Sequence, residues 1–140
     1  MARIYRATDL IQVKIDDVIV KLAPLTLDQK AEVQAAILAG KDRLSIKEAT
    51  RGISVALKYG VKSISGVIDS EDKPYQLQFD ENKHLTQECI DDLMNMEVSQ
   101  KLSLICMDMV NGVPKEFTDG KNNPLDGVEI IKPEPDSKNR

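Results

Sequence analysis

The chain has 140 residues, a net charge of −4 and only 4% aromatic residues, with no tryptophan. This length suits one domain, or one domain with a tail, and it allows a hydrophobic core of ordinary size. The negative net charge would repel a phosphate backbone, and the few aromatic rings offer little surface for base stacking, so we expect no nucleic-acid binding. The core must be built from aliphatic side chains and methionine.

The two cysteines indicate the compartment. Cys89 and Cys106 each stand within an apolar pattern of helical period, which predicts buried free thiols in a reducing environment. The N-terminus lacks the apolar segment of a signal peptide, and no apolar run approaches the roughly 20 residues of a membrane span. We therefore expect a cytoplasmic protein that does not associate with a membrane.

The first predicted element is a β-hairpin over residues 10–22. Apolar residues alternate with polar ones on both sides of the Asp16-Asp17 step. A period of two is typical of half-buried strands, and a two-residue polar step between two such runs indicates a hairpin. The expected core positions are Ile11, Val13, Ile15, Val18, Val20 and Leu22.

Two helices are predicted after Pro24. Thr26 with Gln29, and Ser45 with Glu48, match the capping box that begins many helices. Gly40 and Gly60 are suitable helix ends. Gly52, within the second helix, indicates either close helix packing or a tolerated defect. The expected inward stripes are Leu27, Ala31, Ala35 and Leu38, widened by Ile37, in the first helix, and Ile46, Ala49, Ile53, Ala56 and Leu57 in the second.

A second hairpin is predicted from a strand at residues 61–68 and an alternating run at residues 75–79. The intervening residues 69–74 are dense in turn formers. Starting from Asp69, an EF-hand would need glycine at its sixth position, where this chain has Pro74, so we interpret the segment as a solvated turn. No internal repeat is visible in the sequence.

The third helix begins at Thr86, with Leu85 and Ile90 placed to form a hydrophobic staple. A further helix over residues 98–111 ends near Gly112, and its expected inward face is formed by Val98, Leu102, Ile105, Cys106 and Met109. Beyond Pro114 the chain is polar and rich in proline and glycine, apart from residues 128–131, which can dock as an extended segment. The predicted architecture is α+β, with two β-hairpins and three to four helices in a single domain at residues 1–112, and a flexible or extended tail at residues 113–140.

No residue pattern in the chain indicates catalysis. His84 is the only histidine and lies in the polar stretch DENKH, where a solvated side chain is expected. Neither phosphate-binding glycine motif is present. We therefore predict a protein that is not an enzyme and that has no catalytic residue, no cofactor and no metal site.

Some surface must bind a partner if the protein has no chemistry of its own. Methionines are concentrated in the last two helices, where they serve either as core filler or as an adaptable binding surface. Leu104 lies off the predicted inward stripe of its helix. The candidate partner-binding residues are Leu93, Met94, Met96, Leu104 and Met107.

Residues 61–111 contain a series of short motifs in a fixed order. They are Val61-Lys62, then Gly66-Val67-x-Asp69, an acidic turn that ends at Pro74, a Leu85-Thr86 helix start continued by Leu93, and a final helix with Val98 and Leu102. An earlier run contains Leu22, Pro24, Leu25 and Thr26. With these motifs the chain resembles the tail assembly chaperones of long-tailed bacteriophages, many of which carry the same order.

The resemblance implies a non-catalytic role in phage tail assembly. Such proteins coat the long helical tape measure protein and help to recruit tail tube subunits around it. It also implies that the protein acts in the cytoplasm of the infected bacterial host and is absent from the mature virion, and a homo-oligomer is compatible with this role. The alternatives are a structural tail component (a tube, completion or decoration protein) and a small bacterial adaptor or regulatory domain.

Overall fold

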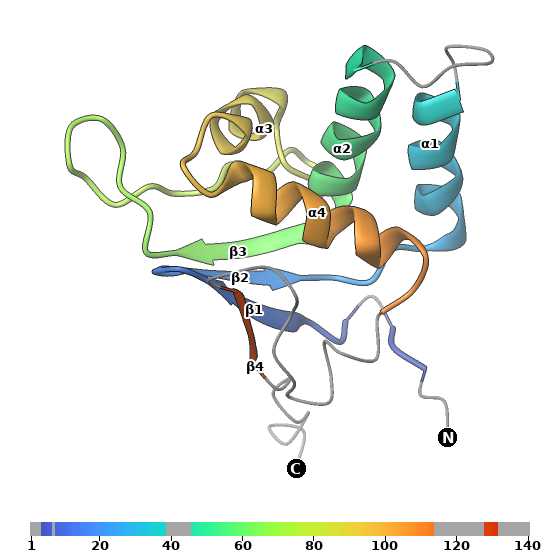
Figure 1. The fold of residues 1–140 in the computed structure, drawn as a ribbon, viewed down its shortest axis with the longest axis horizontal. Helices are drawn as coiled ribbons and strands as arrows, with labels where there is room; N and C mark the ends of the chain where they lie inside the picture. Colours follow the sequence, from blue (N-terminus) through green and yellow to red (C-terminus); the bar gives the residue numbers. More distant parts are fainter. Residues whose placement is uncertain (1–3, 7, 39–45, 114–127, 132–140) are drawn as a thin grey trace.

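The computed structural model describes residues 4–6, 8–38, 46–113 and 128–131. The described strands form one antiparallel sheet in the order β3-β2-β1-β4, and the described helices lie on one face of it (Figure 1). The predicted α+β class is therefore confirmed. The elements in chain order are β1 (Ile11–Ile15), β2 (Val18–Leu22), α1 (Leu27–Leu38), α2 (Ile46–Gly60), β3 (Val61–Ser65), α3 (Gln87–Met94), α4 (Ser99–Val110) and β4 (Val128–Ile131).

The first hairpin forms as the alternating pattern predicts. Ile15 pairs with Val18 across the two-residue turn, and all six expected core positions are at most 7% exposed. Asp16 adopts a left-handed φ of 53°, a conformation that a short polar side chain tolerates better than most. Burying one complete face of two strands supplies about 1.5–3 kcal/mol for each large aliphatic side chain.

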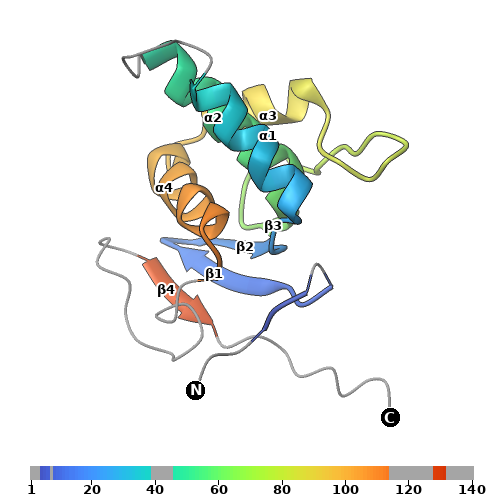
Figure 2. The same ribbon diagram turned by 90° about the vertical axis from the view of Figure 1, so that its right-hand side faces the viewer.

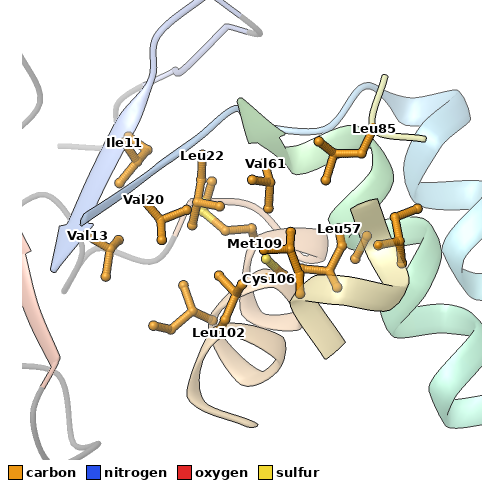
Figure 3. Close-up of a cluster of buried hydrophobic side chains, with 14 of the residues drawn as sticks. Ile11, Val13, Val20, Leu22, Leu57, Val61, Leu85, Leu102, Cys106 and Met109 are labelled. Atoms are coloured by element: carbon orange, nitrogen blue, oxygen red, sulfur yellow. The ribbon is translucent and has the colours of Figure 1, made fainter. Parts of the chain in front are cut away.

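The core lies between this face of the sheet and the helices. Leu102, Cys106 and Met109 of α4 point toward Val13, Val20 and Leu22 of the sheet (Figure 3). The predicted inward face of α4 is thus confirmed. Both cysteines are buried free thiols, as expected, and burial raises the pKa of the Cys106 thiol to about 12.

Helix α1 shows one prediction that is correct and one that is wrong. The capping box forms: the Thr26 N–H donates to Gln29 Oε1 at 2.9 Å, and the Gln29 N–H donates to Thr26 Oγ1 at 3.2 Å. Three residues of the expected inward stripe, however, face outward, with Leu27 81% exposed and with Ala31 and Ala35 also exposed, whereas Ile37 is half-buried.

The inward side of α1 is formed by the buried Val33, which the sequence did not indicate, and by the half-buried Ile37, which was expected there, because the helix packs mainly against α2. A β-carbon at Gly52 of α2 would clash with the Ile37 side chain, so the glycine marks close helix packing. Alanine buries little surface, and this favours the two larger branched side chains in the helix interface. Figure 2 shows α1 and α2 side by side, with α4 nearer the sheet.

The second predicted hairpin does not form, because its two segments do not pair with each other as strands. β3 pairs with β2, with Val20 opposite Ile64, rather than with residues 75–79, which form no strand. Tyr75 and Leu77 are half-buried, but Phe79 is exposed. Pairing with β2 extends an existing core face, whereas an isolated two-stranded hairpin is only marginally stable.

Residues 66–86 instead contain two turns of the same geometry, eleven residues apart. We name them the first Asp turn (residues 67–75) and the second Asp turn (residues 78–86). In the first, Asp69 Oδ1 accepts the N–H groups of Glu71 and Lys73; in the second, Asp80 Oδ1 accepts those of Asn82 and His84, all at 2.8–3.0 Å. The structure therefore contains a local repeat that the sequence did not reveal.

The remaining backbone bonds of the two turns also match. In the first Asp turn, the Asp69 N–H donates to the Lys73 carbonyl and the Tyr75 N–H donates to the Val67 carbonyl. In the second, the Asp80 N–H donates to the His84 carbonyl and the Thr86 N–H donates to the Gln78 carbonyl. Bridges join Ile68 to Pro74 and Phe79 to Leu85. The sixth residue of each turn, Asp72 or Lys83, has a φ of 63°.

The last helices follow the sequence closely. Thr86 caps α3 by accepting the Cys89 N–H, and both members of the predicted staple, Leu85 and Ile90, are buried. Residues 128–131 form β4, which pairs with β1. The other residues of the expected tail, 114–127 and 132–140, lie outside the described residues, as do Gly40 and Ser45.

Candidate functional site

Three chain segments meet at one end of the sheet and border an open groove of about 830 Å³. They are the β1–β2 turn, the residues that follow β3, and the connection between α3 and α4, which lie at the same end of the molecule in Figure 1. The lining residues are Asp16, Asp17, Val18, Gly66, Val67, Ile68, Asp69, Ser70, Tyr75, Asp92, Leu93, Asn95, Met96, Glu97 and Val98.

Gly66 and Lys101 determine how the β1–β2 turn is placed beside the groove. Gly66 has a φ of +83°, and a β-carbon there would clash with the carbonyl oxygen of Asp17. Only glycine therefore allows the chain to leave β3 in contact with this turn. On the other side, Lys101 Nζ of α4 lies 3.4 Å from Asp16 Oδ2. The turn is thus held between the end of β3 and the first half of α4.

The floor of the groove is apolar. Leu93 and Val18 come from the hydrophobic core, and Val67, Met96 and Val98 are half-buried around them. Ile68 is 61% exposed at the edge. Apolar side chains collected in a concave surface favour contact with another apolar surface rather than with water.

The rim of the groove is acidic. Five lining residues are carboxylates and none is basic: Asp16, Asp17, Asp69, Asp92 and Glu97. Within the described part of the chain, neither Asp17 nor Glu97 has an ion-pair partner. A groove walled by charge of one sign concentrates the electrostatic potential and attracts groups of the opposite sign.

Tyr75 joins the rim to the core. Its hydroxyl donates to Asp92 Oδ2 at 2.8 Å and lies 3.4 Å from Cys89 Sγ. Burial, followed by the hydrogen bonds to Cys89 and Asp92, raises the pKa of Tyr75 above its usual range. The phenol therefore stays protonated near neutral pH and acts as a hydrogen-bond donor that orients Asp92, not as a base.

The five candidate partner-binding residues lie in different places. Leu93 is 1% exposed and Met96 is half-buried, and both line the groove. Met94 is half-buried against the core, with its sulfur 3.8 Å from Ser103 Oγ. Leu104, 45% exposed, and Met107, half-buried, lie one turn apart on α4 and do not line the groove.

The sequence did not identify the contribution of the first hairpin to this surface. Asp16, Asp17 and Val18 reach the groove only because β2 pairs with β3, which brings the β1–β2 turn next to residues 66–70. One signal was present: Gly66 interrupts an otherwise strand-like run, and such a glycine often marks a close approach of another backbone.

A second polar cluster lies around Tyr59 of α2. The Tyr59 hydroxyl donates to Glu32 Oε1 of α1 at 2.6 Å, and its ring meets the His84 ring edge-on, with centroids 4.7 Å apart. The hydrogen bond to Glu32, then burial, raises the pKa of Tyr59 to about 12. His84 is half-buried by this packing rather than fully solvated as expected. The cluster ties α1 and the second Asp turn to α2.

Metal ligands and membrane-spanning helices are both absent from the described ranges. No group of three or more His, Cys, Asp or Glu side chains is arranged there to hold a metal ion. Likewise, no helix among these residues has the length and apolar character needed to cross a membrane.

Comparisons with protein-family models, with curated proteins and with solved structures find no match for this chain. The function must therefore be inferred from the groove and from the residues that form it.

Proposed function

We propose that the protein is a bacteriophage tail assembly chaperone that binds the tape measure protein and helps to recruit tail tube subunits, without catalysis. The observation that carries this proposal is the apolar, acidic-rimmed groove. Five of the residues on which the family resemblance depends line it: Gly66, Val67, Asp69, Leu93 and Val98. The resemblance and the groove thus point to the same part of the molecule.

The groove suits holding rather than chemistry. An amphipathic helix can place its apolar face in a hydrophobic groove, with anchors at intervals of three or four residues. A long helical partner such as the tape measure protein offers many such faces. Covering them in the host cytoplasm would prevent their self-association until polymerising tube protein displaces the chaperone.

Co-expression with the tape measure protein of the same phage tests the proposal. The chain should keep that protein in the soluble fraction and should co-purify with it. Ile68→Ser combined with Met96→Ser removes apolar contacts at the groove and should reduce recovery of the complex. Leu27→Ser is the matched control, because Leu27 is a more exposed apolar residue on α1, outside the groove lining.

A tape measure protein that stays insoluble and unbound would contradict the proposal. The composition of purified mature particles provides an independent test, because a chaperone leaves before the tail is complete. Stoichiometric amounts of this chain in mature particles would instead favour a structural tail component.

A further inference from the structure

We propose that the groove selects a basic amphipathic helix, whose apolar face occupies the floor and whose lysine or arginine side chains pair with the acidic rim. This proposal rests on the proposed function for the identity of the whole partner, and it adds the chemistry of the segment that is bound. The two features that carry it are the charge of the rim and the exposed apolar surface within it.

The negative charge of the rim favours a partner segment with positive charge. Asp17 comes from the first hairpin and Glu97 from the α3–α4 connection, and both are exposed. The only ion pair formed by the five lining carboxylates among the described residues is that of Asp16 with Lys101. An acidic partner would be repelled by unpaired carboxylates from two separate elements. A basic partner would be attracted during its approach and would form ion pairs once bound.

The distribution of the carboxylates favours an extended partner over a small ion. Asp69 uses Oδ1 to hold its own turn, and Asp92 accepts the Tyr75 hydroxyl. The acidic groups in the described residues do not converge as a set of metal ligands. Charges spread around an apolar floor match a helix with apolar residues on one side and cations at the edges.

Binding of three labelled synthetic peptides to the full chain, measured by fluorescence anisotropy, tests the proposal. The first peptide is an amphipathic helix with leucine and isoleucine on one face and lysine and arginine on the other. The second keeps the apolar face and replaces the cations with glutamate. The third keeps the cations and replaces the apolar face with serine and glutamine. We expect the first to bind at least about tenfold more tightly than either of the others, and its affinity to fall as salt is added.

Charge-neutral variants locate the binding site. Asp17→Asn combined with Glu97→Gln should weaken binding of the first peptide by about tenfold at low salt, since two desolvated or steering charges are lost. Glu81→Gln combined with Glu88→Gln is the matched control: it removes the same net charge from exposed residues outside the groove. The control should change the affinity by less than about twofold. Far-ultraviolet circular dichroism of both variants should match the parent, because Asp17 and Glu97 make no described ion pair.

Three results would overturn this inference: tight binding of the glutamate peptide, equal weakening by both pairs of substitutions, or equal binding of the peptide without an apolar face. Its failure is distinguishable from failure of the proposed function. If the tape measure protein binds but the Asp17/Glu97 variant binds it equally well, only the inference fails. If the basic peptide binds with the expected variant sensitivity but the tape measure protein does not bind, only the proposed function fails.

Discussion

The first and second Asp turns have the same backbone but different surroundings. Residues 68–74 of the first are exposed: Asp69 and Ser70 border the groove, and the Lys73–Glu71 ion pair, at 3.6 Å, lies in solvent. The second is attached to α2 and β3: the Leu85 N–H donates to the Lys58 carbonyl at 3.3 Å, and Lys62 Nζ donates to the Lys83 carbonyl at 3.3 Å. The first Asp turn therefore contributes exposed surface beside the groove, and the second attaches the connection between β3 and α3 to the rest of the fold.

The difference shows that turn geometry and turn position have separate causes. An aspartate that accepts two N–H groups further along the chain is sufficient to shape each turn. The residue at the eighth position of the turn decides its placement: it is the exposed Pro74 in one and the buried Leu85 in the other. Substitutions at equivalent positions of the two turns separate these two causes.

The largest effect is expected at this eighth position. Leu85→Ala removes a core side chain that is 2% exposed, and should lower the free energy of unfolding by about 2–4 kcal/mol. Pro74→Ala, at the equivalent exposed position, should lower it by less than about 1 kcal/mol, mainly through the entropy of the unfolded chain. Urea denaturation measures both. Equal losses would show that the second turn is no more anchored than the first.

The ninth position should give an intermediate effect. Thr86→Ala removes the hydroxyl that accepts the Cys89 N–H and should cost about 1 kcal/mol of stability. Thr86→Ser retains the cap and should recover most of this loss. Tyr75→Phe, its equivalent, removes an exposed hydrogen bond and should cost about 0.5–1 kcal/mol. A serine variant as unstable as the alanine variant would contradict the capping role.

A smaller effect on stability is expected when glycine replaces a residue that has a left-handed backbone conformation. Lys83→Gly should raise the free energy of unfolding by about 0.5 kcal/mol, because relief of the left-handed conformation exceeds the added entropy of the unfolded chain. Asp72→Gly should change it less, since aspartate tolerates this conformation better. Glu81→Gly, in the same turn but without a positive φ, is the control and should destabilise. Thermal unfolding followed by circular dichroism ranks the three variants, and destabilisation by Lys83→Gly would contradict the expected strain.

The smallest effect concerns pH. The N–H of His84, then that of Asn82, and the nearby charges of His84 and Lys58 hold the pKa of Asp80 below its ordinary value of 3.8, against an opposing effect of desolvation. Because the folded-state pKa is the lower one, the stabilisation is present above pH 3.8 and is lost as the pH falls through the folded-state pKa.

Carboxyl titration by NMR should place Asp80 below its ordinary pKa, and Asp80→Asn should reduce the loss of stability in acid. A resonance of Asp80 that titrates at or above its ordinary value would contradict the hydrogen-bond geometry of the second Asp turn.

Local signals in the sequence predicted the local structure well. The alternation around Asp16-Asp17, the reciprocal Thr26–Gln29 cap and the Thr86 cap all form. Each depends on residues that lie close together in the chain, so period and side-chain chemistry are sufficient. Leu27, Ala31 and Ala35 were wrongly expected on the inward side of α1, because alanine and leucine occur on more than one side of that helix. Ile37 was expected correctly, and only the position of α2 selects Val33.

The residues that line the groove could likewise be predicted only in part from the sequence. Met96 and Leu93 were candidates from the sequence, but Asp17 and Ile68 become their neighbours only through the β2–β3 pairing. The pairing of β2 with β3, which lie far apart in the chain, depends on the burial of a common face, and no local pattern encodes it. The equivalence of the two Asp turns was also hidden, since within residues 69–74 and 80–85 they share only the initial aspartate.

Hydrophobic period and capping chemistry were sufficient to predict the α+β class, the first hairpin and the aliphatic core from the amino-acid sequence. Long-range packing was needed to establish which strand β3 joins and which side of α1 is buried. It also brings the first Asp turn, the β1–β2 turn and the α3–α4 connection together as an acidic groove. Those outcomes depend on packing between segments that are distant in the chain. The total apolar area buried in the folded protein selects among arrangements that the local sequence allows equally well.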